Sequence, residues 1–254
     1  MNITKEMSDM AIEVFNRYEH KYLLSKSDFE QIIGIIGEHM TLDPYNIGRK
    51  PYTIANIYFD TSDDYLIRSS LASPPYKEKL RLRSYGFPDC GTRVFFEIKK
   101  KYRGIVNKRR SVMTLSEAYE FARTGRAPVV KEYMNGQVMR EIEYFLSFYS
   151  PVPKLYLAYD RIAFFEKDNP DLRISFDTKI RSRRHDLRLE HGDYGDALLD
   201  EGTYLMEIKT ARAKPLWLSD VLTRLNIQRC SFSKYGTEYR QFVTALPSVQ
   251  KIAI

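Results

Sequence analysis

Lys77-Glu-Lys-Leu-Arg-Leu-Arg83 is the stretch of this sequence that says most about its fold. The side chains of a β-strand alternate between two faces. This stretch therefore predicts a strand with its two lysines and two arginines on one face and its leucines on the other. Cations that lie two residues apart on the same face repel one another, and they also repel cations on neighbouring strands. A strand of this kind therefore needs water or an anion beside its polar face.

The same alternation recurs along the chain, and on three of the other segments the polar face carries a Glu-x-Lys pair. These pairs are Glu19 with Lys21, Glu97 with Lys99, and Glu207 with Lys209. We expect eight strands, over residues 13–24, 52–60, 77–85, 93–102, 106–114, 154–165, 172–181 and 203–210. Eight strands are enough to close a barrel.

Four helices are expected between and after the strands, beginning near Ser27, Thr114, Val129 and Pro215. Ser27 and Glu30 have the spacing of a capping box, as do Thr114 and Glu117. The second helix should end near Gly125 and the third near Tyr149. With no repeat and no linker rich in glycine, serine or proline, this pattern predicts a single α+β domain.

Composition narrows the class of partner. The chain has 254 residues, of which 43% are apolar, and a net charge of +7, which favours a nucleic acid, an acidic membrane surface or a phosphorylated small molecule. Cys90 and Cys230 have no metal-type spacing, so we expect free thiols in a reducing compartment. A polar N-terminus and the lack of a long apolar run predict a cytoplasmic protein without a membrane span.

The cationic strand faces allow two arrangements. They could be solvated outer faces of a sheet, which often carry lysine. They could instead line the inside of a closed barrel, and we favour this because the same charge recurs on strand after strand while acidic residues gather on helices and loops. Lysine and arginine donors that converge from all sides suit a linear chain of phosphates. Carboxylates among them would hold Mg²⁺ or Mn²⁺.

Two basic runs, Lys99-Lys-Lys101 and Lys108-Arg-Arg110, look like a nucleic-acid patch. Both runs lie within alternating strands, so half of their side chains must point the other way. We therefore expect no nucleic-acid partner, although a basic nucleic-acid-binding β-protein stays open as an alternative. The sequence contains no Walker A motif, no glycine-rich dinucleotide loop and no Gly-x-Ser-x-Gly elbow.

Nine short segments, in their order and spacing, carry a family resemblance. They are Arg17-Tyr-Glu-His-Lys-Tyr22, Tyr58-Phe-Asp-Thr61, Lys79-Leu-Arg-Leu-Arg-Ser-Tyr-Gly86, Phe96-Glu-Ile-Lys99, Lys108-Arg-Arg110, Tyr159-Asp-Arg161, Arg173-Ile-Ser-Phe-Asp177, Glu207-Ile-Lys209 and Ser231-Phe-Ser-Lys-Tyr-Gly236. Together they resemble the VTC domain, the polyphosphate polymerase domain of the vacuolar transporter chaperone family, in its stand-alone bacterial form. This family belongs to the triphosphate tunnel metalloenzymes, and the resemblance spans about Arg17 to Tyr239.

The resemblance implies a closed eight-stranded antiparallel β-barrel of CYTH-like type with flanking helices, as one domain over residues 1–254 with a core of about 13–241. By matching position, the catalytic phosphate ligands would be Lys21, Arg81, Arg83, Lys99, Lys108, Arg161, Arg173 and Lys234. Further substrate contacts would come from Lys79, Tyr159, Lys209 and Ser233. A divalent metal would be held by Glu207, with Glu97 and Glu19 as further candidates.

The implied reaction is the metal-dependent transfer of the γ-phosphoryl group of ATP to a growing polyphosphate chain. Two alternatives stay open: a tunnel triphosphatase that hydrolyses tripolyphosphate or a nucleoside triphosphate, and a non-catalytic module that binds polyphosphate or nucleotide. One position departs from the pattern. Tunnel triphosphatases begin with Glu-x-Glu-x-Lys, whereas Arg17 stands here at the first glutamate, which favours the polymerase branch.

Overall fold

The computed structural model describes residues 18–46, 48, 50–103, 105–167, 171–211 and 213–246, and Arg17 therefore lies outside the described residues. Its strands are β1 (Tyr18–Leu24), β2 (Met40–Leu42), β3 (Tyr52–Asp60), β4 (Tyr76–Tyr85), β5 (Arg93–Tyr102), β6 (Ile105–Thr114), β7 (Val152–Glu166), β8 (Arg173–Arg183), β9 (Asp196–Ala197), β10 (Tyr204–Thr210) and β11 (Arg229–Cys230). The helices are α2 (Lys26–His39), α3 (Tyr65–Leu71), α4 (Leu115–Thr124), α5 (Gly136–Tyr149), α6 (Leu216–Arg224) and α7 (Lys234–Ala245). The predicted α+β class is confirmed.

The eight long strands were all predicted, but the closure of the barrel was not predicted correctly. The strands form one antiparallel sheet of 11 strands in the order β11-β1-β10-β8-β7-β3-β4-β5-β6, with β2 beside β7 and β9 beside β8. Within the described residues, no backbone pairing joins β6 to β1 or β11. Closure would need the free edge of β1, and β11 already occupies that edge by pairing with Lys21 and Tyr22.

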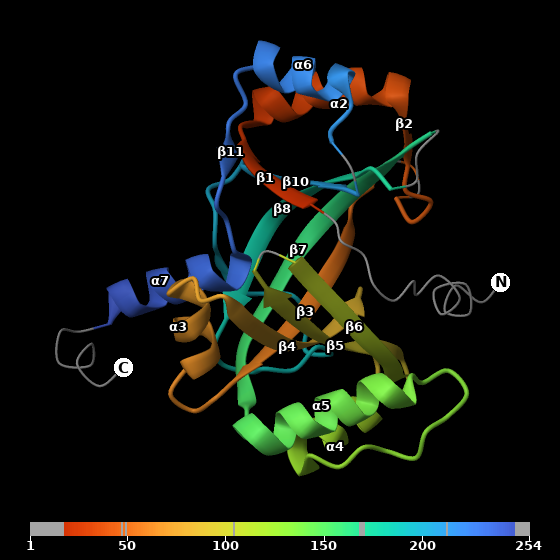
Figure 1. Ribbon diagram of the computed structural model, residues 1–254, viewed down its shortest axis with the longest axis vertical. Coiled ribbons are helices and arrows are strands. Elements are labelled where there is room, and N and C mark those ends of the chain that lie inside the picture. Colours follow the sequence, from red (N-terminus) through yellow and green to blue (C-terminus); the bar gives the residue numbers. More distant parts are fainter. Residues whose placement is uncertain are drawn as a thin grey trace.

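The open sheet nevertheless rolls up (Figure 1). Strands β1 and β5 are separated along the sheet by β10, β8, β7, β3 and β4, yet Glu19 Oε2 on β1 lies 3.7 Å from Lys99 Nζ on β5. Side chains therefore bridge the seam between the two halves, and we call the enclosed side of the sheet its inner face. Antiparallel sheets twist strongly, which brings the two ends of the sheet together.

Helices cover the outer face in two places (Figure 1). Apolar residues of β3–β6, such as Leu80 and Phe96, pack with α4 and α5 into one core. Residues of β1, β8 and β10, such as Phe176 and Ile208, pack with α2 and α6 into another. Full burial of a side chain such as Phe96 stabilises the fold by about 1.5–3 kcal/mol. The apolar strand faces thus point outward beneath helices, and the cationic faces point inward.

The inner face is not cationic along its whole length. At one end Leu155, Leu157 and Leu205 join a third apolar cluster, together with Tyr235 and Tyr239 of α7. Helices α3 and α7 contact one another at this end. Here the inner face is closed by apolar packing, so its polar section is bounded on one side.

Helix boundaries show where local signals were misread. The N-cap of α2 is Ser25 instead of Ser27: its side chain accepts a hydrogen bond from Asp28 N, and Asp28 completes the capping box. The helix predicted from Val129 starts only at Gly136, where Asn135 caps it. Glycine is costly inside a helix but tolerated in a first turn beside a cap. The capping box at Thr114 is confirmed, as is the stop at Gly125, whose φ of +69° is left-handed.

Two helices, α3 and α7, were missed although each has an ordinary N-cap residue. The N-cap of α3 is Asp64, and the carboxylate of Asp60, at the end of β3, accepts hydrogen bonds from Leu66 N and Ile67 N. The N-cap of α7 is Ser233, but a glycine stands at the position where a capping box would have glutamate. Neither helix therefore shows a complete capping box, and α3 has only seven residues in which an apolar stripe could show.

Replacement of Ser25 by alanine should lower the free energy of unfolding by about 1 kcal/mol, because Asp28 N loses its acceptor. The matched control is Ser27→Ala, which leaves the capping box intact and should change stability far less. The measurement is the midpoint of urea unfolding at unchanged slope. Equal losses in the two variants would show that Ser25 is not the cap.

Candidate active site

Strand register places the predicted site residues on one face. Directly paired residues of neighbouring strands point to the same side: Lys79 pairs with Lys99, which pairs in turn with Lys108. On the other half, Lys21 pairs with Glu207. The predicted strand residues on the inner face are Glu19, Lys21, Lys79, Arg81, Arg83, Glu97, Lys99, Lys108, Tyr159, Arg161, Arg173, Glu207 and Lys209. The alternative of solvated outer faces is therefore wrong, while the roles of the residues stay predictions.

Helix α7 contributes the two remaining predicted residues. Ser233 is its N-cap, and Lys79 Nζ lies 3.4 Å from Ser233 Oγ. Lys234, in the first turn, is buried and its Nζ lies 2.5 Å from Asp177 Oδ2 and 3.2 Å from Glu207 Oε1. Burial opposes the charge of Lys234, but the two carboxylates outweigh burial and raise its pKa. A helix N-terminus thus delivers a charged lysine to the inner face.

A first cluster of charges surrounds Glu97. Its carboxylate lies 2.7 Å from Arg81 Nε and 2.6 Å from Lys108 Nζ, and Arg83 Nε lies 3.8 Å away. Burial opposes ionisation of Glu97, yet the three cations outweigh it and hold its pKa well below the usual range. Both oxygens of Glu97 are therefore engaged in orienting cations.

A second cluster surrounds Glu207. Its carboxylate lies 3.2 Å from Lys209 Nζ, 3.4 Å from Arg161 Nη2 and 3.5 Å from Lys21 Nζ. Burial opposes its charge as well, but Lys234 and the other cations hold the pKa of Glu207 well below its usual value. Glu207 is therefore a carboxylate shared among several cations.

Asp177 is a site residue that sequence reasoning did not assign. Its two oxygens accept hydrogen bonds from Arg161 at 2.6 and 2.8 Å, and it is fully buried. Its position two residues along from Ser175 and four from Arg173 puts it on the cationic parity, which was the available signal. Asn56 and Tyr58, on β3, were also missed: they accept hydrogen bonds from Arg83 and Arg81.

Cations outnumber carboxylates on the inner face. The cations are Lys21, Lys77, Lys79, Arg81, Arg83, Lys99, Lys101, Lys108, Arg110, Arg161, Arg173, Lys209 and Lys234; the carboxylates are Glu19, Glu97, Asp177 and Glu207, with Asp43 beside Arg173. Burial, before any neighbouring charge, lowers the pKa of Lys209 and brings that of Lys79 to about 7. Partly buried cations with too few counter-charges are the electrostatic signature of a site for an anion.

Two polar atoms of β8 on this face have no hydrogen-bond partner. Arg173 Nε and Ser175 Oγ are both buried and unsatisfied, although Arg173 Nη2 reaches Asp43 Oδ2 at 3.2 Å. An unsatisfied buried donor costs about 1–3 kcal/mol unless a ligand or water meets it. Both atoms therefore add to the capacity of the inner face to bind an anion.

The carboxylates fit a divalent cation only together with a bound ligand. Within the residues described, no group of three histidine, cysteine, aspartate or glutamate side chains could hold a metal ion alone. Glu19 and Glu207, however, each lie 3.5 Å from Lys21 Nζ and so lie near one another. One or two carboxylates plus phosphate oxygens and water are the usual setting of Mg²⁺. Glu97 suits this role less well, because Arg81 and Lys108 engage its oxygens.

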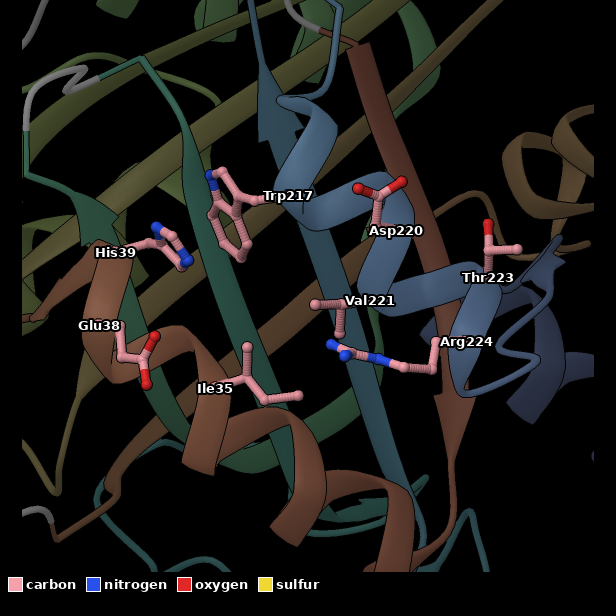
Figure 2. Close-up of a pocket in the computed structure, with 8 residues that line it drawn as sticks. All are labelled: Ile35, Glu38, His39, Trp217, Asp220, Val221, Thr223 and Arg224. Carbon is pink, nitrogen blue, oxygen red and sulfur yellow. The ribbon is translucent and has the colours of Figure 1, made fainter.

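A separate groove of about 510 Å³ lies between α2 and α6, on the outer side of the sheet (Figure 2). The Trp217 ring stacks on His39 with centroids 4.3 Å apart, and Glu38, Asp220 and Arg224 line the same groove. With more carboxylates than cations, this groove does not match a polyanion. We therefore place the candidate site on the inner face.

Comparison with known families identifies the family of the chain. The VTC domain profile matches residues 16–243, nearly the whole chain. The chain belongs to the VTC domain family. No curated protein matches it at a significant level of similarity. None of the helices in the part of the chain that is described has the length and apolar character needed to cross a membrane.

Solved structures share the fold of this VTC domain. A Bacillus halodurans protein, provisionally assigned as an adenylate cyclase, superposes with a TM-score of 0.54 and 16% identity, over 87% of this chain and 96% of its own. The Hippeastrum protein HpAC1, named as an adenylyl cyclase and described as having a dominant triphosphatase activity, gives a TM-score of 0.51 and 16% identity, over 94% and 99% of the two chains. At this identity the likeness concerns the fold alone.

Binding of a polyanion should protonate Lys79. Burial, and then Lys99 and other cations, lower its pKa to about 7. A bound phosphate chain favours the ammonium form and so raises that pKa, and affinity should therefore fall as the pH rises above about 7. Near pH 8 we expect uptake of close to one proton per tripolyphosphate, measured by titration calorimetry in buffers of different ionisation enthalpy.

Lys79→Arg is the matched variant for this measurement. Arginine stays protonated throughout the pH range, so the variant should bind tripolyphosphate with that proton uptake removed. The same uptake in the variant and the natural protein would contradict the assignment of the proton to Lys79.

Proposed function

We propose that this VTC domain is a metal-dependent polyphosphate polymerase, which transfers the γ-phosphoryl group of ATP to the end of a polyphosphate chain on the inner face. The observation that carries the proposal is the excess of lysines and arginines, most of them partly buried, over carboxylates on the enclosed side of the sheet. Such a surface binds a polyanion along its length, and membership of the VTC domain family supports this substrate class.

The reaction breaks the bond between the γ-phosphorus and the oxygen that bridges it to the β-phosphate. A new bond forms between the γ-phosphorus and a terminal oxygen of the acceptor chain, and ADP leaves with the bridging oxygen. The acceptor oxygen is already ionised at neutral pH, so no general base is required. Phosphoryl transfer then depends on positioning and on stabilisation of charge, both of which fixed arginines and lysines supply.

Several arginines are held in place for this task before any ligand binds. Arg81 is fixed by Glu97 and Tyr58, and Arg83 by Asn56 Oδ1 at 2.9 Å and Tyr159 Oη at 3.2 Å. Pre-oriented donors need no reorganisation when charge moves in the transition state. We propose that the predicted phosphate ligands together bind both the triphosphate and the end of the polyphosphate chain.

A divalent cation would be held by Glu207 and Glu19 together with phosphate oxygens. Both carboxylates are ionised: burial and Glu207 oppose the charge of Glu19, but lysines outweigh them and lower its pKa to about 2. When bound, Mg²⁺ or Mn²⁺ neutralises part of the phosphate charge. Glu97 stays a weaker candidate for this role.

Hydrolysis of a triphosphate is the second candidate, and the activity described for HpAC1 supports it. A hydrolase has to orient and deprotonate water, for which Glu19 or Glu97 would be needed. A pKa near 2 makes Glu19 a poor base, and the cations around Glu97 hold its pKa well below the usual range, which makes it a poor base as well. These two observations favour the polymerase.

Incubation of the protein with ATP and Mn²⁺ should yield long phosphate chains and ADP. Gel electrophoresis with a stain for polyphosphate separates chains from short products, and a parallel assay measures orthophosphate. Orthophosphate without chains would refute the polymerase in favour of the triphosphatase. ATP that stays intact while it binds would favour the non-catalytic module.

Glu207→Gln should reduce turnover by about 100-fold or more while tripolyphosphate still binds, because the variant loses a metal ligand and keeps the surrounding cations. The control is Glu141→Gln, on α5, whose carboxylate lies 3.5 Å from Lys100 Nζ on the outer side of the sheet. Turnover is measured as release of ADP, and affinity by calorimetry. Full activity in Glu207→Gln would exclude Glu207 from the metal site.

A further inference from the structure

The inner face changes chemical character from one end to the other. Along β4 its side chains run from Lys79 through Arg81 and Arg83 to Tyr85, and along β5 the same rows hold Lys99, Glu97 and Phe95. One end of these strands is therefore rich in lysine, and the other is aromatic. Binding of phosphates explains the rows of lysine and arginine. It does not explain why aromatic rings follow them along the same strands.

Three rings form what we call the aromatic shelf: Tyr52 on β3, Tyr85 on β4 and Phe95 on β5. The ring centroids of Tyr52 and Tyr85 are 6.0 Å apart, and those of Tyr85 and Phe95 are 5.6 Å apart with the rings nearly perpendicular. Phe95 is 5% exposed, whereas Tyr85 is 39% exposed. Tyr52 and Phe95 thus contact Tyr85 from both sides, and much of the surface of Tyr85 stays exposed.

Cations border the shelf. The guanidinium carbon of Arg110 lies 4.7 Å from the Phe95 ring centroid, and Arg173 Nη2 lies 3.5 Å from Tyr52 Oη. Arg83, two residues before Tyr85 on the same face, links the shelf to the phosphate ligands at a separation of roughly 6.7 Å along the strand. That step is comparable to the span from an α-phosphate across a ribose to its base.

We propose that the aromatic shelf binds the nucleobase of ATP, with the triphosphate running from Arg83 towards Lys79 and the polyphosphate chain at the lysine end. The proposal rests on the proposed function and adds a direction to it. Bases stack on aromatic rings whatever their identity, with a gain of roughly 5–150-fold in affinity per base. ATP and GTP therefore bind the shelf with similar affinity.

The test compares ATP with tripolyphosphate, which shares the phosphates and lacks the base. Tyr85→Ala should weaken ATP binding about 10-fold and leave tripolyphosphate within twofold, whereas Tyr85→Phe should bind both as the natural protein does. Tyr144→Ala, which removes an exposed ring from α5 on the outer side, is the control and should change neither affinity. Dissociation constants come from titration calorimetry at fixed Mg²⁺.

Equal losses for ATP and tripolyphosphate in Tyr85→Ala would overturn the proposal, since the ring would then support the phosphate site alone. Unchanged ATP binding would overturn it too. A second arm examines the opposite end: Lys101→Ala, on the row beyond Lys99, should weaken long polyphosphate and spare ATP. All these measurements are of binding affinity, so they test the aromatic shelf even if the protein synthesises no chains. A failure of the shelf proposal can therefore be told apart from a failure of the polymerase proposal.

Discussion

A buried cation must have an anion, and the structure of this VTC domain is organised around that requirement. Apolar strand faces are covered from outside by α2, α4, α5 and α6, which leaves the opposite faces, with their lysines and arginines, to face one another. Among the described residues, Glu19, Glu97, Asp177 and Glu207 oppose them, together with Asp43 beside Arg173. The remaining positive charge favours an anionic ligand. Stability and ligand binding are therefore linked through the same side chains.

The four carboxylates of β1, β5, β8 and β10 have different roles. Asp177 and Glu97 are buried and fully engaged, so they hold Arg161, Arg81 and Lys108 in place. Breaking such a buried pair costs about 3–5 kcal/mol because it strands the partner charge. Glu19 is more exposed and lies near Glu207, which suits the two for transient coordination of a cation with the substrate.

Strand parity predicted which side chains of each strand share a face, because side chains alternate with a period of two residues. The structure brings Arg81, Lys99 and Glu207 to one face of the sheet, and their roles stay predictions. Parity could not say whether the roll closes, because β11 is a two-residue strand without a pattern of its own. It also could not find α3, a helix of only seven residues whose first turn is held by Asp60 on the preceding strand. Asp177 carried the right parity but gave no hint of its partner, Arg161.

The two halves of the rolled sheet are joined differently from neighbouring strands. Peptide hydrogen bonds hold neighbouring strands at a spacing of about 4.8 Å, whereas between β1 and β5 the contact is an ion pair whose lysine, Lys99, is 41% exposed. Salt screens such a pair, and its strength is small. Loss of this contact would therefore break no hydrogen bond between strands.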